Sequence, residues 1–192
     1  MAINLVEEIQ QNLGWPALQK IDPNTQEVKK PENVSAADYL GQAAIPAVLL
    51  GLYKFSGNKE GNAAIVNGSL SDNLLNRILG NTKDEVVQKV AEYTGNTTDY
   101  TAGRMELIAR EAIKVINENI STHTSDEAVR TFLIDQRNNI LVYIPAGLQI
   151  GKVLHDNTID DRTNKMEGPV SSNMHWLEKL FPSTDRKKEE NF

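Results

Sequence analysis

The sequence contains no cysteine. That absence excludes disulfide bonds, thiolate metal sites and a cysteine nucleophile. Long apolar runs are also missing, because the longest, residues 43–53, is shorter than the roughly 20 residues that a membrane-spanning helix needs. Residues 1–13 include two glutamates and no basic side chain, which is unlike a secretory signal. We therefore expect a cytoplasmic protein without a membrane span.

An excess of basic residues is missing as well. The 192-residue chain has 20 Lys and Arg against 26 Asp and Glu, for a formal net charge of −6. Because nucleic-acid-binding proteins present a basic surface, this balance predicts that nucleic acid is not a partner. Apolar residues make up 40% of the chain, which is enough for a buried core in one domain or two small ones.

Apolar residues recur at spacings of three and four, which is typical of helices. Residues 3–13 show this spacing before Gly14 and Pro16 end it. At four places a hydroxyl residue stands three positions before an acidic residue, an arrangement that caps the start of a helix. These pairs are Ser35 with Asp38, Ser69 with Asp72, Thr82 with Glu85, and Thr124 with Glu127. The pattern predicts an all-α fold.

The helical pattern divides the chain into three parts. Residues 1–34 should form an N-terminal helix and a loop, 35–181 a compact domain of about eight or nine helices, and 182–192 a disordered tail. We expect helices at 2–13, 36–56, 60–67, 71–79, 83–94, 99–121, 125–136, 138–155 and 172–181. The helix at 99–121 is apolar on more than one face and should be the central buried one. A strand at 138–144 is discounted, because it would have no partner strand.

Two apolar segments share the sequence Ile-Pro-Ala, at Pro46 and Pro145. A proline inside a helix kinks it and frees a carbonyl group. We therefore expect two proline-interrupted helices. Bent core helices that cross one another are the preferred interpretation, and a functional hinge is the alternative.

The middle of the chain resembles a known helical family. The segment IPAVLLGL is followed by EGNAAIVNGSLSDNLLNRILGNTKDEVVQKVAEYTGNTTDYTAGRMELIAREAIKVI. Short helices around a leucine–glycine turn, then a Thr-Gly step and a long apolar helix, are similar to the uncharacterised YidB-like family of bacterial proteins. The resemblance covers roughly residues 40–120. It implies an all-α protein, with no activity or catalytic residues to carry over.

A densely charged segment, HDNTIDDRTNKMEG at 155–168, is the main candidate site. Several of its oxygen-bearing side chains follow the spacing of an EF-hand calcium loop, namely Asp156, Thr158, Asp160, Asn164 and Glu167. The segment departs from that pattern because Asp161 replaces the turn glycine, and because Gly168 and Pro169 follow where the exiting helix should run. Arg162 and Lys165 would also repel a cation. A calcium site is therefore not expected.

Other uses of this segment are weighed in the same way. His155 and His175 with Asp156 or Asp160 could form a two-histidine, one-carboxylate metal site, or His155 could exchange protons with Asp160 or Glu167. The spacing requires neither. We prefer an ordered polar clamp, with ligand binding as the alternative. The candidate binding residues are His155, Asp156, Asp160, Asp161, Arg162, Lys165 and Glu167. We predict no catalytic residue, no metal and no cofactor.

The last predicted helix, 172–181, has a strong apolar edge. Its candidate interaction residues are His175, Trp176, Leu180 and Phe181. Such an edge must either cover the core or meet a partner. The helix is therefore a candidate contact element.

These features together predict a non-enzymatic, cytoplasmic helical protein that acts through protein–protein contact or self-association. The alternative is a protein, or an enzyme, that binds a small molecule or a metal through residues 155–167. In that case native mass spectrometry would detect the added mass of the bound ligand. Peripheral membrane binding through residues 36–55 is a third hypothesis. The acidic balance and the lack of a basic polar face count against it.

Overall fold

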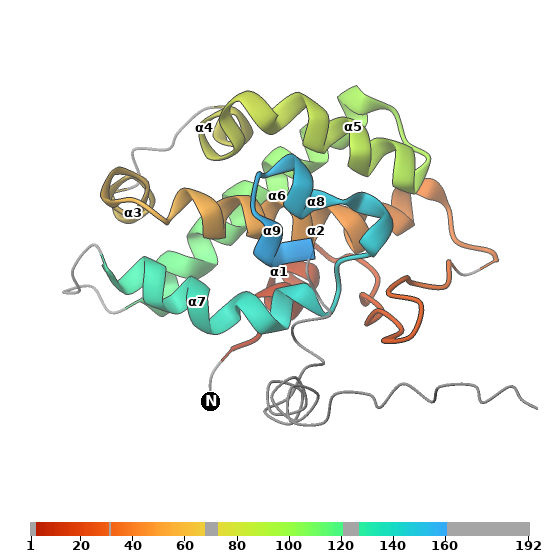
Figure 1. Ribbon diagram of the computed structural model, residues 1–192, viewed down its shortest axis with the longest axis horizontal. Coiled ribbons are helices and arrows are strands. Elements are labelled where there is room, and N and C mark those ends of the chain that lie inside the picture. Colours follow the sequence, from red (N-terminus) through yellow and green to blue (C-terminus); the bar gives the residue numbers. More distant parts are fainter. Residues whose placement is uncertain (1–2, 31, 68–72, 121–126, 161–192) are drawn as a thin grey trace, which may run out of the picture. The chain divides into compact units, whose positions relative to one another are not determined.

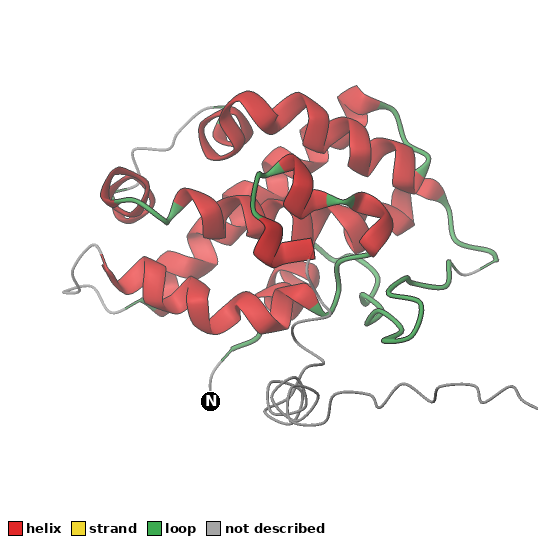
Figure 2. Ribbon diagram, in the orientation of Figure 1, coloured by secondary structure: helices red, strands yellow, loops and turns green. Residues whose placement is uncertain are grey.

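The computed structural model describes residues 3–30, 32–67, 73–120 and 127–160. Every regular element in these ranges is a helix, and none is a strand (Figure 2). The elements are α1 (Leu5–Asn12), α2 (Ala36–Phe55), α3 (Lys59–Val66), α4 (Leu74–Leu79), η1 (Gly80–Thr82), α5 (Lys83–Thr94), α6 (Thr98–Asn119), α7 (Glu127–Leu141), η2 (Ala146–Leu148), α8 (Ile150–Val153) and α9 (Asn157–Asp160). The all-α prediction is therefore confirmed. No helix in these ranges is long and apolar enough to cross a membrane.

Several sequence predictions fall outside the described ranges. They are the capping pairs at 69–72 and 124–127, the helix at 172–181 and the tail at 182–192. These stay predictions, as does the division of the chain into three parts.

Helix α2 lies at the centre of the described helices (Figure 1). Its residues 39–52 are all buried, and α1, α4, α5, α6 and α7 pack around it. The reason is composition, since no charged side chain stands in that stretch. The prediction that 99–121 forms the central helix was wrong. Its counterpart α6 leaves Tyr100 41% exposed and Leu107 45% exposed.

The two prolines occupy different structures. Pro46 lies inside α2, which continues without a break. Pro145 follows α7 in an extended conformation, with φ −66° and ψ 139°. Proline lacks an amide hydrogen and disfavours a helical residue before it, so the chain turns after Leu141 and resumes with η2 and α8. The predicted helix at 138–155 was therefore wrong, and the predicted pair of proline-interrupted helices is not confirmed.

Side-chain caps explain where several helices begin. The Ser35 hydroxyl accepts a hydrogen bond from the Asp38 amide, as the capping box predicts, and donates to the Asp38 carboxylate at 2.7 Å. Thr97 caps α6 through its hydroxyl. The box predicted at Thr82 was wrong. Thr82 has helical backbone angles, and its hydroxyl donates to the Leu79 carbonyl at 2.7 Å. A 3-10 turn thus joins α4 to α5 without a fresh cap.

A buried glutamine of α7 attaches the start of the chain to the helices. The Gln136 side chain accepts a hydrogen bond from the Leu5 amide at 2.9 Å and donates to the Ile3 carbonyl at 3.0 Å. The primary amide therefore pairs with the backbone as a neighbouring strand would, and it satisfies groups that α1 leaves free at its start. Helix α1 then packs against α2, α6 and α7.

A second buried glutamine, in α2, holds the loop that follows α1. The Gln42 side chain accepts from the Gln19 amide at 2.8 Å and donates to the Gln19 carbonyl at 2.9 Å. It also donates to the Tyr143 carbonyl at 3.0 Å. One side chain thus satisfies three backbone groups from two distant loops, which are otherwise without a helix or sheet partner.

A tight corner joins α2 to α3. The Asn58 side chain caps α3 by accepting from the Gly61 amide at 2.7 Å. A Cβ atom at Gly61 would lie 1.9 Å from the carbonyl oxygen of Phe55, the last residue of α2. The corner therefore has no room for any side chain at this position.

Candidate functional site

The described part of the charged segment forms a capped turn. His155 has a left-handed backbone, with φ 53°. The Asp156 carboxylate accepts hydrogen bonds from the Thr158 amide at 3.1 Å and from its hydroxyl at 2.7 Å, which caps the start of α9. The side chain of Asp160 is outside what the structure describes. So are Asp161, Arg162, Lys165 and Glu167, together with His175, Trp176, Leu180 and Phe181 of the predicted interaction helix.

Basic side chains next to this turn cap the ends of helices. The Arg130 guanidinium lies 4.3 Å from the centre of the Tyr53 ring and donates to the Tyr53 carbonyl at 2.7 Å, at the end of α2. Arg137 donates to the Thr158 carbonyl at 2.7 Å, and Lys54 donates to the carbonyl of Leu154. Positive side chains stabilise helix C-termini because free carbonyls point there. These cations therefore serve the fold.

A metal site is not assembled in the residues that the structure describes. No group of three or more His, Asp or Glu side chains converges there in a way that could hold an ion. The predicted pairing of His155 with His175 falls outside those residues.

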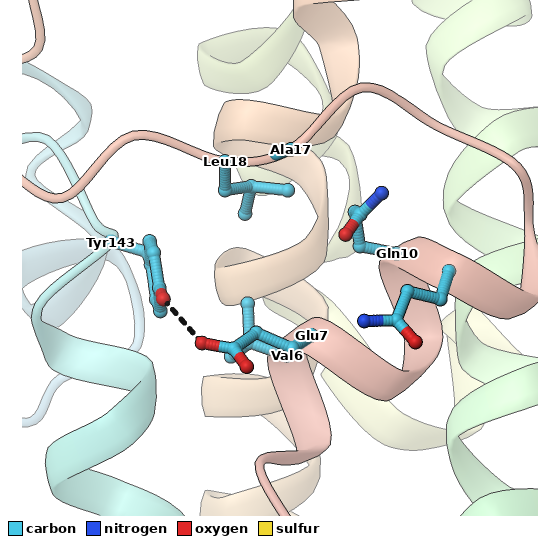
Figure 3. A pocket seen from close by; sticks show the side chains of 7 residues that line it. Val6, Glu7, Gln10, Ala17, Leu18 and Tyr143 are labelled. Atoms are coloured by element: carbon cyan, nitrogen blue, oxygen red, sulfur yellow. Dashed lines mark hydrogen bonds between the residues drawn. The ribbon is translucent and has the colours of Figure 1, made fainter.

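A cavity of about 200 Å³ lies beside α1 (Figure 3). Its lining residues are Val6, Glu7, Gln10, Gln11, Ala17, Leu18 and Tyr143. The Tyr143 hydroxyl donates to the Glu7 carboxylate at 3.0 Å, and the Asn4 side chain donates to the same oxygen at 2.9 Å. Burial and the bond to Glu7 raise the pKa of Tyr143 above its ordinary value. The cavity is smaller than typical ligand pockets, which begin at roughly 300 Å³. The Glu7 carboxylate on its wall is already used to join α1 to Tyr143, in the loop after α7.

A tyrosine pair joins the N-terminal loop to α2 and α5. The Tyr93 hydroxyl donates to the Glu27 carboxylate at 3.1 Å and lies 3.4 Å from the Tyr39 hydroxyl. The two rings stack with their centres 6.0 Å apart. Burial, the hydrogen bond to Tyr39 and the charge of Glu27 raise the pKa of Tyr93 well above its ordinary value. The pair is a structural junction, and the Tyr93 hydroxyl must keep its proton in order to donate it to Glu27.

This junction predicts a loss of stability at alkaline pH. In the unfolded chain Tyr93 ionises near pH 10, whereas in the folded protein it holds its proton, so the unfolding free energy falls as pH rises above about 10. Urea unfolding midpoints between about pH 8 and about pH 11 should show this decline, and Tyr93→Phe should reduce its slope. Tyr100→Phe is the matched control, because it also removes one hydroxyl group but from an exposed tyrosine. An unchanged slope in Tyr93→Phe would contradict the assignment.

An arginine stacked between aromatic rings marks the outer face of α6. The Arg104 guanidinium lies 4.8 Å from the Trp15 ring centre and 5.9 Å from that of Tyr100. The Trp15 ring also rests on Gly41 of α2, where a Cβ would come within 2.7 Å of a ring carbon. Contact with two rings, of which Trp15 is packed against α2, restricts the guanidinium.

Arg104 differs from the other described arginines in its polar contacts. Its Nε atom is buried and has no hydrogen-bond partner, and the guanidinium makes no ion pair with any described carboxylate. Arg130 and Arg137 each donate to backbone carbonyls, and Arg110 lies 3.8 Å from Glu106. Because the Nε atom is buried, a carboxylate from outside would bind at the terminal guanidinium nitrogens, which make no ion pair with a described carboxylate.

The neighbourhood of Arg104 completes this surface. Leu107 follows one turn later and is 45% exposed, and Gly103 is exposed with nothing within 4 Å of a built Cβ. Glu111 lies a further turn along, where its carboxylate accepts from Asn12 of α1 at 2.9 Å and from Lys114 at 3.0 Å. We call Trp15, Tyr100, Gly103, Arg104, Leu107 and Glu111 the α6 surface.

The α6 surface is absent from the sequence predictions. Trp15 and Arg104 are far apart in the chain, so only the fold brings them together. One signal was present: Tyr100 and Leu107 stand seven residues apart, on a helix face that also carries Arg110 and Lys114. Apolar residues on the charged face of a helix indicate a contact surface. Comparisons with family models, with curated proteins and with solved structures find no match to this chain, so the resemblance of residues 40–120 to the YidB-like family stays a prediction.

Proposed function

We propose that this protein acts by contact with another protein, without catalysing a reaction, and that the α6 surface is the contact site. The observation that carries the proposal is the Arg104 guanidinium, stacked on Trp15 and Tyr100 and left without an acceptor among the described residues. Arginine, tryptophan and tyrosine are the residue types that dominate binding energy at protein interfaces.

Preorganisation strengthens the argument. A free arginine side chain loses rotamer freedom when it binds, which weakens the contact. Arg104 has already lost that freedom to the two rings, so binding would cost less entropy. The exposed Leu107 side chain beside it supplies apolar surface that a partner would bury.

Two other carboxylates of the described structure have internal roles. Glu27 accepts from the Gly147 amide and the Tyr93 hydroxyl, and Glu106 accepts from the amides of Leu74 and Leu75 at the start of α4. Their bonds hold loops and helix ends together. The alternative function, ligand binding by residues 155–167, rests mostly on side chains that the structure does not describe, and it stays a prediction from the sequence.

Site-specific photo-crosslinking in cells that make the protein tests the proposal. A photoreactive amino acid at Leu107 should give a covalent protein adduct, and Arg104→Ala should abolish it. The same amino acid at Ile134 of α7, which is 49% exposed, is the matched control and should give little adduct. Equal yields at the two positions, or a yield unaffected by Arg104→Ala, would contradict the proposal.

A further inference from the structure

Two opposite charges lie on one flank of the α6 surface. Arg104 stacks on Trp15, just after α1, and Glu111 accepts from Asn12 at the end of α1. Both therefore lie at the edge of the exposed face of α6 that borders α1. They are seven residues apart, which is about 10.5 Å along a helix, too far for an ion pair with each other. Leu107 stands between them.

We infer that the partner is a second copy of this chain, bound to α6 through a two-fold, antiparallel contact. The inference rests on the proposed function and names its partner. An antiparallel pair related by a two-fold axis brings the same flank of both helices together with the direction reversed. An axis beside Leu107 therefore places Arg104 of each copy opposite Glu111 of the other copy.

The bonding state of these two side chains fits that arrangement. Arg104 has no ion pair with a described carboxylate, and its terminal guanidinium nitrogens, rather than the buried Nε, are the atoms left for a partner. Glu111, whose side chain is 17% exposed, uses Oε1 both for a hydrogen bond from Asn12 and for an ion pair with Lys114, and Oε2 has no partner among the described residues. Two equivalent ion pairs would therefore form without breaking an existing bond. Charge complementarity of a surface with itself is what a two-fold contact requires.

The shape of the surface also suits a facing helix. Gly103 precedes Arg104, and no heavy atom lies within 4 Å of a Cβ built on it. That open space lets a second helix approach the α6 backbone closely. The exposed side chain of Leu107 would then be covered by its counterpart beside the axis, and the exposed Tyr100 would face the region of Lys114 of the second copy. The net charge of −6 opposes association of two copies at long range, so the dimer should be weak and favoured by moderate salt.

A charge-reversal experiment on the full chain tests this inference by sedimentation equilibrium. Arg104→Glu leaves two acidic side chains on the flank of each copy, and Glu111→Arg leaves two basic ones. Each variant alone should dimerise at least about tenfold more weakly than the wild type. An equimolar mixture of the two should associate again, because in a mixed pair both acidic side chains of one variant face the basic side chains of the other. Loss of folding cannot produce such a recovery.

Lys59→Glu, at an exposed position in the first turn of α3, is the control for net charge and should leave the dimer constant within about twofold. A wild-type protein that stays monomeric at all concentrations would overturn the inference. So would a wild-type dimer whose two reversed variants fail to associate when mixed. The proposed function would survive either result if crosslinking at Leu107 captured a different protein in an Arg104-dependent way, and it would fail with the inference if no such adduct formed.

Discussion

Gln42→Leu is expected to lower the free energy of unfolding by about 3 kcal/mol. Leucine has a similar volume but cannot hydrogen-bond. The substitution therefore leaves the amide and carbonyl of Gln19 and the carbonyl of Tyr143 without their partner. Leaving a buried backbone group unpaired costs about 1 to 3 kcal/mol, and the Tyr143 carbonyl is the most enclosed of the three.

Urea unfolding at neutral pH measures this loss, and hydrogen exchange at the Gln19 amide locates it. Gln88→Leu is the matched control, because Gln88 is exposed on α5 and, among the described residues, its side chain bonds to the exposed end of Glu92 at 2.8 Å and to no backbone group. That variant should stay within about 0.5 kcal/mol of the wild type. A Gln42→Leu protein as stable as the control would show that the loop is held by other contacts.

Gly61→Ala is expected to destabilise the protein by about 3 to 4 kcal/mol. The added methyl carbon would lie 1.9 Å from the Phe55 carbonyl oxygen. That atom belongs to the backbone of α2, so it cannot swing aside as the end of a side chain would. Either α3 must move away from α2, or the last turn of α2 must open.

Gly103→Ala is the control for replacing a helical glycine. Nothing lies within 4 Å of its built Cβ, and alanine loses less backbone entropy on folding, so this variant should gain about 0.5 to 1 kcal/mol. Thermal unfolding of dilute protein compares the two. Similar melting temperatures for both variants would mean that the corner between α2 and α3 yields readily.

Local patterns predicted the helices well where local chemistry decides them. The cap at Ser35 and the uncharged stretch 39–52 were enough to place α2. Pro145 shows the limit, because the same Ile-Pro-Ala sequence lies inside a helix at Pro46 and outside one at Pro145. Burial on all sides keeps α2 helical there, and burial is a property of the whole fold.

The candidate site was harder to predict for a related reason. The charged segment was predicted as a candidate site because its charged residues are adjacent in sequence. In the structure, however, Asp156 caps a turn. The α6 surface depends on Trp15 meeting Arg104, a contact that no sequence spacing encodes. Capping and periodicity are local, whereas stacking between distant segments appears only once the chain has folded.

The bond between Gln136 and the Leu5 amide spans 131 residues of sequence, and this has a consequence for the order of folding. Helix α1 leaves the ribosome long before α7 does, so it is among the last elements to find its partner. Until α7 has been made, the Leu5 amide lacks its acceptor, the Gln136 side chain. Helix α1 also lacks the part of its packing surface that α7 supplies. Contacts this distant are slow to form because a long loop must close first. The nascent chain therefore carries the apolar face of α1, with Leu5, Val6 and Ile9, incompletely covered while the residues up to α7 are synthesised.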